Sequence, residues 1–524
     1  MHSKESNDKI SLLIYAVSLV ALFLVIFGLV PRPVIFLPAA LITGFLLRAP
    51  LKDGALFFIR FIPFFFALPL TARFDNFNLW RIAIIILFVK WLLAERRVPD
   101  ARGEVLRAGV FVSLRQALGR AWRSARAELL GASLLAFGLL SLLAAQDLTA
   151  GLRRVIYFAN MALLFIIVRD LTRREPGFFH AVAHNFFISG IAVVALGFMQ
   201  WFVAYIISAS TFHYWWGQMV SLGMYGSQWA NIATNFGNTW FSYSGGGLRL
   251  RMFSIFPDSH SFPLYLLTVL PFLFALLFDR SLRTLWNRRS LWLSFFAMHL
   301  AMILSGTRGI WAGALAPALA LAVSWRPMPL LRPHVNKLLL SLAAFALMFP
   351  LAWGLILLPQ FHEEATTPSR DVFLSRLTSL IDTQETSNSG RIAIWKKTLQ
   401  SIAKYPLLGV GIGNYPLVLN QDIAAAKAGS SAHNLFLHLA AEMGIAALAV
   451  FLWFIYEIMR RAVRELHRVA RPEYAGLFLA AALFSLVWIL AYSLTDPAIF
   501  DERAFLGFMV LLGTVLGITR AGQK

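Results

Sequence analysis

The chain has 524 residues, of which 59% are hydrophobic and 14% are charged, and its formal net charge is +21. The hydrophobic residues gather in runs of about 15 to 25, the length that crosses a bilayer, which excludes a water-soluble globular protein. The positive charge falls in alternate loops between these runs, as it does on the cytoplasmic side of membrane proteins, so we expect no nucleic acid as a partner.

The hydrophobic runs predict an all-α integral membrane protein, a polytopic helical bundle of about 14 transmembrane helices. Both termini then lie in the cytoplasm, and the clusters of arginine and lysine fall on the same side. The first run is longer than the core of a signal peptide, so we interpret it as the first span. The predicted spans are 11–30, 33–47, 55–71, 79–94, 129–146, 153–168, 182–208, 261–279, 291–305, 309–324, 338–359, 434–459, 474–495 and 503–519.

Within the predicted N-terminal region, 1–208, the segment 101–128 differs from the spans. On a helical wheel its apolar arc holds Leu106, Val110, Leu114, Leu118 and Trp122, and its basic arc holds Arg102, Arg115, Arg120, Arg123 and Arg126. The pattern predicts an amphipathic helix on the anionic inner leaflet. We favour a membrane anchor over a regulatory element.

Two long loops are predicted on the outer side of the membrane. The first, 209–260, is rich in aromatic residues and glycine, which is typical of an interfacial and partly re-entrant loop. The second, 360–433, contains one predicted helix, Arg391 to Lys404, which Pro406 ends. The loops separate the central spans, 261–359, from the C-terminal spans, 434–524.

Arginines stand out on the predicted outer side, against the usual distribution of positive charge. Arg308 lies in "LSGTRG" between two short spans, Arg391 begins the loop helix, and Arg251 precedes the span that starts near 261. Such an arginine can reach lipid headgroups, pair with a carboxylate, or bind phosphate, whose oxygens match its planar fork. Near Arg251, Asp258 and His260 are weak signals on their own.

The glycine-rich segment "GVGIGN", 409–414, resembles a nucleotide-binding loop only superficially. No β-strand is predicted before it, and it faces outward. We interpret it as a tight backbone turn against the membrane.

The stretch "SSAHNLFLHLAAEMG", 430–444, joins a polar loop to a hydrophobic run. If Ser431 or Ala432 caps the helix, His433 and Asn434 lie in its first turn, where free backbone N–H groups favour an anion. Imidazole titrates close to neutrality and suits general-base catalysis, although an interfacial histidine can equally be structural.

Two further polar residues follow inside the same run. His438 and Glu442 are four residues apart and share one face of the helix. A carboxylate at this depth needs a partner or a functional reason. We expect this pair to brace the helix within the bundle.

The order of these motifs, "SGTRG", "SGRIAIW", "YPLLGVGIGNYP" and "AHNLFLHLAAEMG" over residues 250–445, resembles the O-antigen ligase and O-antigen polymerase superfamily. The resemblance implies a membrane glycosyltransferase with a GT-C-like fold in the bacterial inner membrane. Such an enzyme moves a glycan from an undecaprenyl-pyrophosphate donor to a glycan or lipid A-core acceptor at the periplasmic face. No cofactor and no metal are implied, and membrane lipids are the remaining partners.

The resemblance also implies roles for individual residues. Arg308, Arg391 and the weaker match Arg251 would hold the pyrophosphate, and His433 would be the catalytic base that activates the acceptor hydroxyl. Apart from the resemblance, we expect Asn434, Glu442 and His438 to be supporting residues. Thr307 stands where the family usually has serine, and Asp258 follows Pro257 where many members have asparagine.

The chemistry expected of these residues is consistent with the resemblance. Preorganised cations stabilise the charge that develops on a departing diphosphate, and a base must take the proton of the attacking hydroxyl. We find no second, nucleophilic carboxylate near the histidine motif, which favours inversion at the anomeric carbon. We also find no histidine and carboxylate set with the spacing of metal ligands.

The alternative function is a flippase or transporter for lipid-linked glycans. That class favours charged residues near the membrane midplane and internal repeats. The motifs here cluster on the outer side, and no repeat of fixed period is found. The choice between ligase and polymerase stays open.

Overall fold

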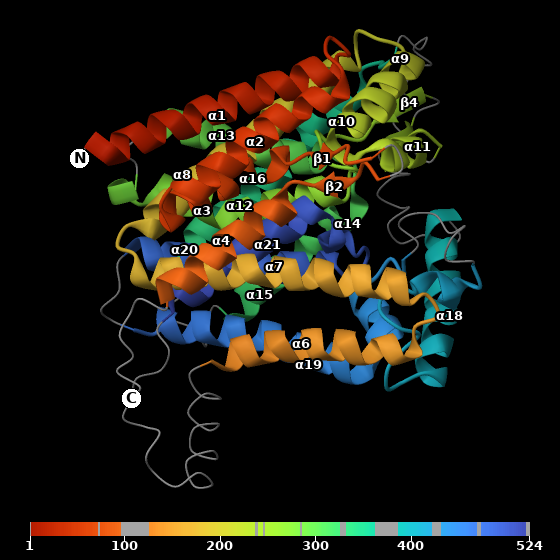
Figure 1. Cartoon of the computed structure of the whole chain (residues 1–524). Helices are drawn as coiled ribbons and strands as arrows, with labels where there is room; N and C mark the ends of the chain where they lie inside the picture. The colour runs from red at the N-terminus through yellow and green to blue at the C-terminus, as the bar shows by residue number, and fades with distance from the viewer. Residues whose placement is uncertain are drawn as a thin grey trace, which may run out of the picture.

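A computed structural model describes residues 2–71, 74–95, 125–235, 239–244, 247–282, 286–324, 332–361, 386–421, 431–468 and 473–519. The protein is mostly helical, and Figure 1 shows the long helices lying side by side across the view. The helices of the first part are α1 (His2–Ile26), α2 (Phe36–Arg48), α3 (Leu51–Phe61), α4 (Trp80–Glu95), α6 (Arg126–Ser141), α7 (Leu148–Arg174) and α8 (Phe178–Val203).

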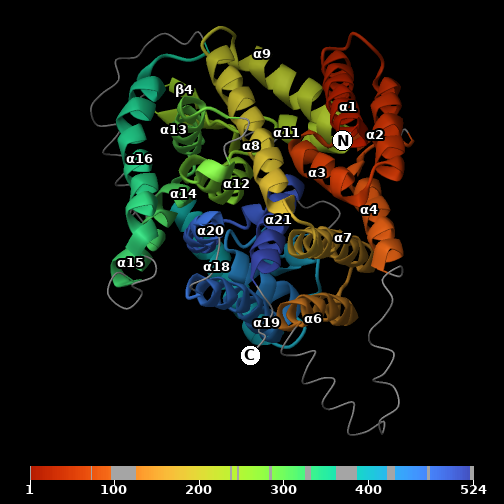
Figure 2. The same ribbon diagram turned by 90° about the vertical axis from the view of Figure 1, so that its left-hand side faces the viewer.

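The second part of the chain completes the bundle. Its helices are α12 (Ser261–Phe278), α13 (Arg288–Leu304), α14 (Arg308–Gly313), α15 (Leu315–Ser324), α16 (Arg332–Leu357), α18 (Thr386–Lys404), α19 (Leu435–Leu466), α20 (Glu473–Tyr492) and α21 (Glu502–Ile518). Figure 2 shows α12 in the middle of the molecule. It packs against α8, α13, α20 and α21, and 94% of its residues are buried, as expected of a helix that is hydrophobic all round.

Within the described residues, eight helices are long and apolar enough to cross a membrane, and Arg308–Val323 forms a shorter apolar stretch. The chain is therefore a polytopic helical membrane protein, as the hydrophobic runs predict. The eight are α1, α6, α7, α8, α12, α16, α19 and α20. Each of the other predicted runs contains at least one shorter helix.

The predicted spans 55–71 and 309–324 each divide into shorter elements. The run 55–71 contains α3, which ends at Phe61, then a 3₁₀ turn and strand β1 (Ala67–Leu68), which pairs with β2 (Phe77–Asn78). Pro63 has no N–H to donate and so interrupts the helical ladder. The run 309–324 divides at Ala314 into α14 and α15.

The segment predicted as a re-entrant loop, 209–260, is largely built from short helices. They are α9 (Ala209–His213), a π-helical turn (Tyr214–Val220), α10 (Ser221–Tyr225) and α11 (Ser227–Asn235). A hairpin of β3 (Phe241–Ser244) and β4 (Gly247–Leu250) follows, with Phe241 opposite Leu250. Figure 1 shows α9, α11 and β4 at the same end of the bundle as α18, which we call the α18 end.

The predicted amphipathic basic helix falls mainly outside the described residues, which leave out 96–124. Its last arginine, Arg126, is instead the first residue of α6. There its guanidinium lies 3.6 Å from the buried carboxylate of Glu457 in α19.

Helix α18 lies across the α18 end of the bundle (Figure 1). It begins at Thr386, before the predicted Arg391, and ends at Lys404 as predicted. The indole N–H of Trp395 donates to the carbonyl of Ala432 at 2.9 Å. Since Ala432 directly precedes His433, this bond fixes the loop helix to the start of the histidine motif.

The glycine-rich segment packs against a break in α19. Gly444 has a φ of 86° inside this helix, and the backbone N–H of Val410 donates to the carbonyl of Ala441 at 2.9 Å across the break. At Gly409, with φ 65°, an added Cβ would lie 2.3 Å from the same carbonyl oxygen. Only glycine therefore fits these two positions, and the segment is a tight turn rather than a nucleotide site.

Candidate functional site

His433 lies just before α19 rather than in its first turn. Its φ of 46° is left-handed, which is uncommon for a residue other than glycine. Asn434, not Ser431 or Ala432, is the N-cap of α19 and accepts from the backbone N–H groups of Phe436 and Leu437. Serine and asparagine are equally good N-caps, but Ser431 Oγ accepts from the N–H of His433 at 3.3 Å and from none of the helix, so the predicted helix start is wrong.

The predicted anion site at this helix start is also wrong. Asn434 Oδ1 takes the N–H groups of Phe436 and Leu437 at 3.0 Å each. The N–H of Leu435 donates to the carbonyl of Ser493, just after α20, at 2.8 Å. The donors that would bind an anion are thus already paired within the protein, and Asn434 has a structural role.

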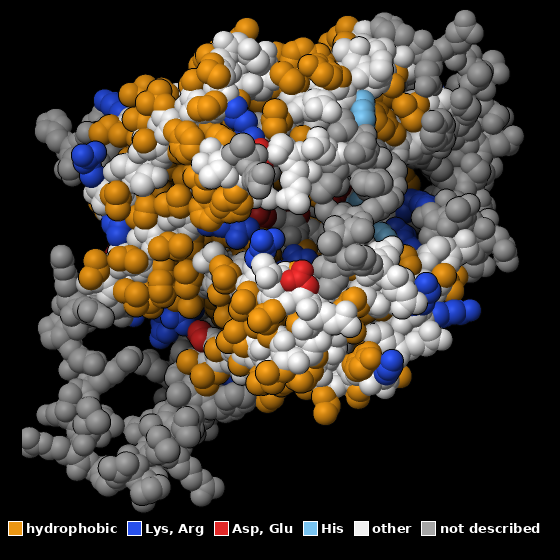
Figure 3. Space-filling model, turned by 45° about the vertical axis from the view of Figure 1, so that its right-hand side comes forward, with side chains coloured by type: hydrophobic (Ala, Val, Ile, Leu, Met, Phe, Trp, Pro, Cys, Tyr) orange, Lys and Arg blue, Asp and Glu red, His pale blue; other side chains and the backbone are white. Residues whose placement is uncertain are grey.

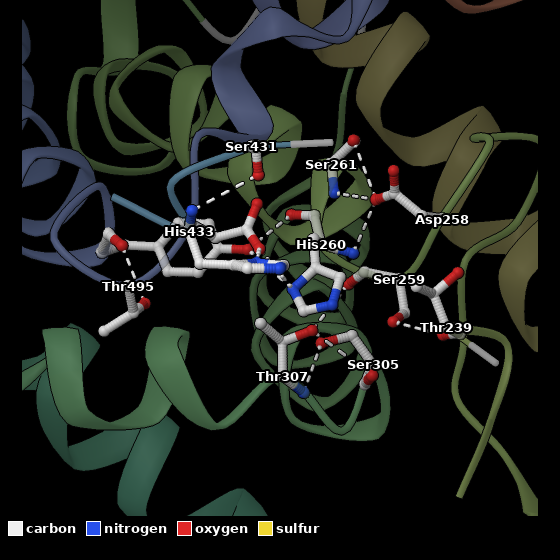
Figure 4. Close-up of polar contacts among 12 residues, drawn as sticks. Thr239, Asp258, Ser259, His260, Ser261, Ser305, Thr307, Ser431, His433 and Thr495 are labelled. Atoms are coloured by element: carbon white, nitrogen blue, oxygen red, sulfur yellow. Dashed lines mark hydrogen bonds and ion pairs between the residues drawn. The ribbon is translucent and has the colours of Figure 1, made fainter. Parts of the chain in front are cut away.

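The side chain of His433 meets a carboxylate and a second histidine. His433 Nδ1 lies 3.5 Å from Asp496 Oδ2, and His260 Nδ1 lies 3.6 Å from the same oxygen. Figure 4 shows the two imidazoles directed toward each other. The side chain of His433 is 39% exposed and that of Asp496 only 12%, so His433 is the member of the cluster that a substrate can reach.

The electrostatics of the cluster favour a charged Asp496. Burial alone would raise the pKa of the Asp496 carboxyl, but His260, the hydrogen bond with His433 and the charge of Arg391 hold that pKa below its usual range. Burial lowers the pKa of His260 against the attraction of Asp496. Asp496 is therefore an anion at neutral pH.

The backbone around His260 is held on two sides. Asp258 Oδ1 accepts from the N–H groups of His260 at 2.9 Å and Ser261 at 2.7 Å, which satisfies donors at the start of α12. The hydroxyl of Tyr492, at the end of α20, donates to the carbonyl of His260 at 3.1 Å. These bonds place the His260 ring beside Asp496.

Arg251 lies against the turn between α13 and α14. Its Nε donates to the carbonyl of Ser305 at 3.2 Å, and one terminal nitrogen lies 3.3 Å from Thr307 Oγ1. The buried Thr307 hydroxyl donates in turn to the carbonyl of Ser259 at 2.7 Å (Figure 4). Thr307 thus links Arg251 to the segment that carries His260.

Arg308 and Arg391 come to this site from two other elements. Arg308 is the first residue of α14, and the glycine after it packs so tightly that an added Cβ would lie 2.1 Å from Thr495 Oγ1. Thr495 directly precedes Asp496. Arg391 lies in α18, and its charge acts on both His260 and Asp496.

His438 and Glu442 belong to a different part of α19. They are buried, with His438 Nε2 3.5 Å from Glu442 Oε1. The same Glu442 oxygen accepts from the backbone N–H of Tyr415 at 3.1 Å, and the His438 ring stacks on the Tyr415 ring with centroids 4.5 Å apart. The pair therefore braces the segment after the glycine run and does not join the His433 cluster.

Two members of the cluster were not predicted as site residues. His260 was a weak signal, and Asp496 did not enter the sequence reasoning. The expectation that no second carboxylate lies near the histidine motif is wrong, because Asp496 lies 3.5 Å from His433. One signal was available for Asp496: it lies in "SLTDPAIF", at the end of a hydrophobic run on the same predicted side of the membrane as His433. Its pairing with His433 depends on two segments that meet only in the folded chain.

His180 and His184 are four residues apart in α8 and do have the spacing of metal ligands, contrary to the expectation that no such set occurs. The structure accounts for His184, whose Nε2 lies 2.8 Å from the carbonyl of Leu282 and whose Nδ1 accepts from the indole of Trp286 at 3.1 Å. In the part of the chain that the structure describes, no group of three or more histidines and carboxylates is arranged to hold a metal ion.

Comparison with known families identifies part of the chain. Residues 293–452 match the family model described as O-antigen ligase. The match includes Arg308, Arg391 and His433 but leaves out His260 and Asp496. No curated protein matches the chain. The family that the order of motifs indicates is thus confirmed over this region.

Proposed function

Because residues 293–452 form an O-antigen ligase domain, we propose that this integral membrane protein is a glycosyltransferase of the ligase or polymerase type. It transfers a glycan from an undecaprenyl-pyrophosphate donor to an acceptor hydroxyl. The protein crosses the bacterial inner membrane about fourteen times in a GT-C-like fold, and both of its termini lie in the cytoplasm. The α18 end then faces the periplasm.

One observation carries this proposal: a partly exposed histidine, a buried carboxylate and arginines from separate elements converge at the α18 end. The Nδ1 of His433 faces Asp496, which favours the tautomer with its proton on Nδ1. Nε2 is then left to take the proton of the acceptor hydroxyl. The carboxylate of Asp496 stabilises the imidazolium that forms.

The arginines supply the other half of the reaction. Arg251, Arg308 and Arg391 hold the diphosphate and stabilise the charge that develops as it leaves. The acceptor oxygen forms a bond to the anomeric carbon, the bond from that carbon to the diphosphate oxygen breaks, and the proton goes to His433. This direct displacement inverts the anomeric centre and requires no metal. The donor lipid stays in the membrane while its sugar reaches the boundary.

The first test uses cells whose surface polysaccharide depends on this protein. We expect His433→Ala and Arg391→Ala to abolish that polysaccharide, because each removes a group that acts at the reacting centre. Lys396→Ala is the matched control, since Lys396 is exposed on the same helix as Arg391. Normal polysaccharide in both mutants would contradict the proposal.

A second assay separates the enzyme from the alternative flippase. Purified protein in detergent is incubated with lipid-linked donor and with acceptor, and the product is analysed for a new glycosidic bond. A transferase forms this bond. Translocation of the donor in vesicles without a new bond would instead identify a flippase.

A further inference from the structure

His260 is the member of the His433 cluster that has no part in the proposed transfer. Its Nδ1 lies 3.6 Å from Asp496 Oδ2, and the Nδ1 of His433 lies 3.5 Å from the same oxygen. The side chain of His260 is 17% exposed, against 39% for His433. On the α18 end, which comes forward in Figure 3, histidine side chains lie with lysine or arginine in a hollow of the surface. A substrate that enters the cluster therefore meets His433 first, and the contact that His260 makes is with Asp496.

The hydroxyl of Tyr492 indicates which nitrogen of His260 carries a proton. This hydroxyl donates its proton to the backbone carbonyl of His260 at 3.1 Å, and its oxygen lies 3.4 Å from His260 Nδ1. The Tyr492 oxygen and Asp496 Oδ2, which both lie close to Nδ1, are therefore both acceptors. A proton on Nδ1, which the Nδ1–H tautomer and the imidazolium both have, satisfies this arrangement. His260 thus presents an N–H group to the carboxylate.

The two contacts of Asp496 Oδ2 are slightly longer than hydrogen bonds, whose N and O atoms lie about 2.7 to 3.2 Å apart. Contacts between catalytic groups are often long without substrate and shorten when the substrate is bound. One carboxylate oxygen has two lone pairs, so it can accept from both imidazoles at once. His260 therefore does not compete with His433 for the carboxylate.

His260 is held by more bonds than the side chain of Asp496. The backbone N–H of His260 donates to Asp258 Oδ1 at 2.9 Å, and its carbonyl accepts from Tyr492. Asp496 lies in the segment between α20 and α21. In the part of the chain that the structure describes, the polar groups that contact its carboxylate are the two imidazoles. Of these two, the fixed and less exposed ring of His260 sets where the carboxylate lies.

We propose that His260 is a positioning residue, whose N–H group holds Asp496 in the orientation in which Asp496 holds His433. The inference rests on the proposed function and deepens it, because it gives a role to a residue outside the matched region, 293–452. His260 acts through the carboxylate and not on either substrate. Its loss therefore lowers the rate of the chemical step and leaves the binding of donor and acceptor unchanged.

A direct role for His260 is the alternative that the experiments must separate from this one. The charges of Arg251 and Arg391, which hold the donor diphosphate in the proposed function, also act on His260. In the alternative role the His260 ring contacts that diphosphate itself. The two roles differ in whether the effect of His260 depends on Asp496, and a double-mutant cycle measures this dependence.

Two substitutions separate the N–H group of His260 from the rest of its ring. His260→Leu removes the N–H group, and His260→Asn keeps one at the place of Nδ1, because both nitrogens are bonded to Cγ. In the transfer assay with purified protein in detergent, we expect kcat to fall about tenfold in His260→Leu and less than about twofold in His260→Asn, with both KM values unchanged. A tenfold loss in His260→Asn would overturn the inference, whether or not the leucine variant folds.

His213→Leu is the matched control. His213 lies in α9, in the same segment 209–260, and the centre of its ring is 5.9 Å from that of Trp240. Its kcat should change less than about twofold, because His213 is not part of the cluster. The Tm of each variant in detergent shows whether the protein is folded. A tenfold loss of kcat in this control would overturn the inference, since the effect would not be specific to His260.

The double-mutant cycle tests whether His260 acts through Asp496. When His260→Leu is added to Asp496→Asn, we expect kcat to fall less than about twofold further, because the charge that His260 positions is already gone. A tenfold loss in both backgrounds would overturn the inference and favour the direct contact with the diphosphate. A wild-type protein that forms no glycosidic bond would contradict the proposed function. Normal transfer in the wild type with an unchanged kcat in His260→Leu would contradict the inference alone.

Discussion

At the scale of single residues, the candidate site depends on one carboxylate shared by two histidines. Asp496 Oδ2 lies 3.5 Å from His433 and 3.6 Å from His260. His433 reaches it from a left-handed backbone conformation, and such conformations are concentrated at functional sites. Asp496 is therefore the residue whose chemistry most directly tests how His433 works.

Replacing Asp496 by asparagine keeps the shape of the side chain and removes its charge. We expect Asp496→Asn to lower kcat about 100-fold with little change in either KM, because the amide cannot stabilise the imidazolium. Steady-state transfer rates measure this. Asp258→Asn is the control, since asparagine can also accept the two N–H groups at the start of α12, and its kcat should change less than about twofold.

The pH dependence of the protein's stability provides a second test of the charge on Asp496. The pKa of Asp496 is lower in the folded protein than its usual value, so its charge stabilises the fold above about pH 4, and this contribution is lost as the pH falls through the folded pKa. The difference in Tm between wild type and Asp496→Asn should be constant from neutral pH to about pH 5 and shrink below about pH 4. A difference that does not shrink below about pH 4 would contradict an ionised Asp496.

At the scale of elements, the break in α19 and the glycine-rich segment form one unit. The N–H of Ile445, just after the break, donates to the carbonyl of Pro406 at 2.9 Å. An added Cβ at Gly444 would lie 2.0 Å from the carbonyl oxygen of Leu407. Each segment therefore satisfies backbone groups that the other leaves open.

Alanine at either glycine should disrupt the contacts between the glycine-rich segment and the break in α19. We expect Gly409→Ala and Gly444→Ala to lower the free energy of unfolding by at least about 2 kcal/mol, because both positions have positive φ and lie against backbone. Thermal unfolding in detergent measures the loss. Gly354→Ala, which sits in open space in α16, should be neutral or slightly stabilising. Unchanged Tm values for both variants would show that these contacts do not stabilise the fold.

At the scale of the whole molecule, the arginines, histidines and carboxylate of the site gather at the α18 end, while the long helices behind it are apolar. Figure 1 shows α18 lying across that end. If the α18 end faces the periplasm, a diphosphate at the membrane boundary and a sugar in water can be handled at one place. The orientation is therefore the main prediction at this scale.

The chain contains no cysteine, so single introduced cysteines report its orientation without background. We expect Lys396→Cys, exposed in α18, to react with a membrane-impermeant maleimide in intact cells with a permeable outer membrane. Arg289→Cys, exposed near the start of α13 at a predicted cytoplasmic position, should react only after the inner membrane is opened. The reverse pattern would contradict a periplasmic site.

The sequence by itself determined the class of protein and pointed to part of the candidate site. Hydrophobic runs long enough for a bilayer predict a helical membrane protein, because run length is a local property of the chain. The same local reasoning located Arg308, Arg391 and His433 within motifs. It also led to two errors at α19, where Asn434 rather than Ser431 is the cap and the first N–H groups are already paired.

Only the tertiary structure decided which side chains act together. Asp496 lies 63 residues after His433, and His260 lies far before both, so no spacing in the sequence joins them. Packing of α20 against α12 and α19 brings their ends together at one boundary, and the histidines and the arginine that meet Asp496 there keep it charged despite its burial. The pairing of His433 with Asp496 is therefore a property of the packed helices, not of any one motif.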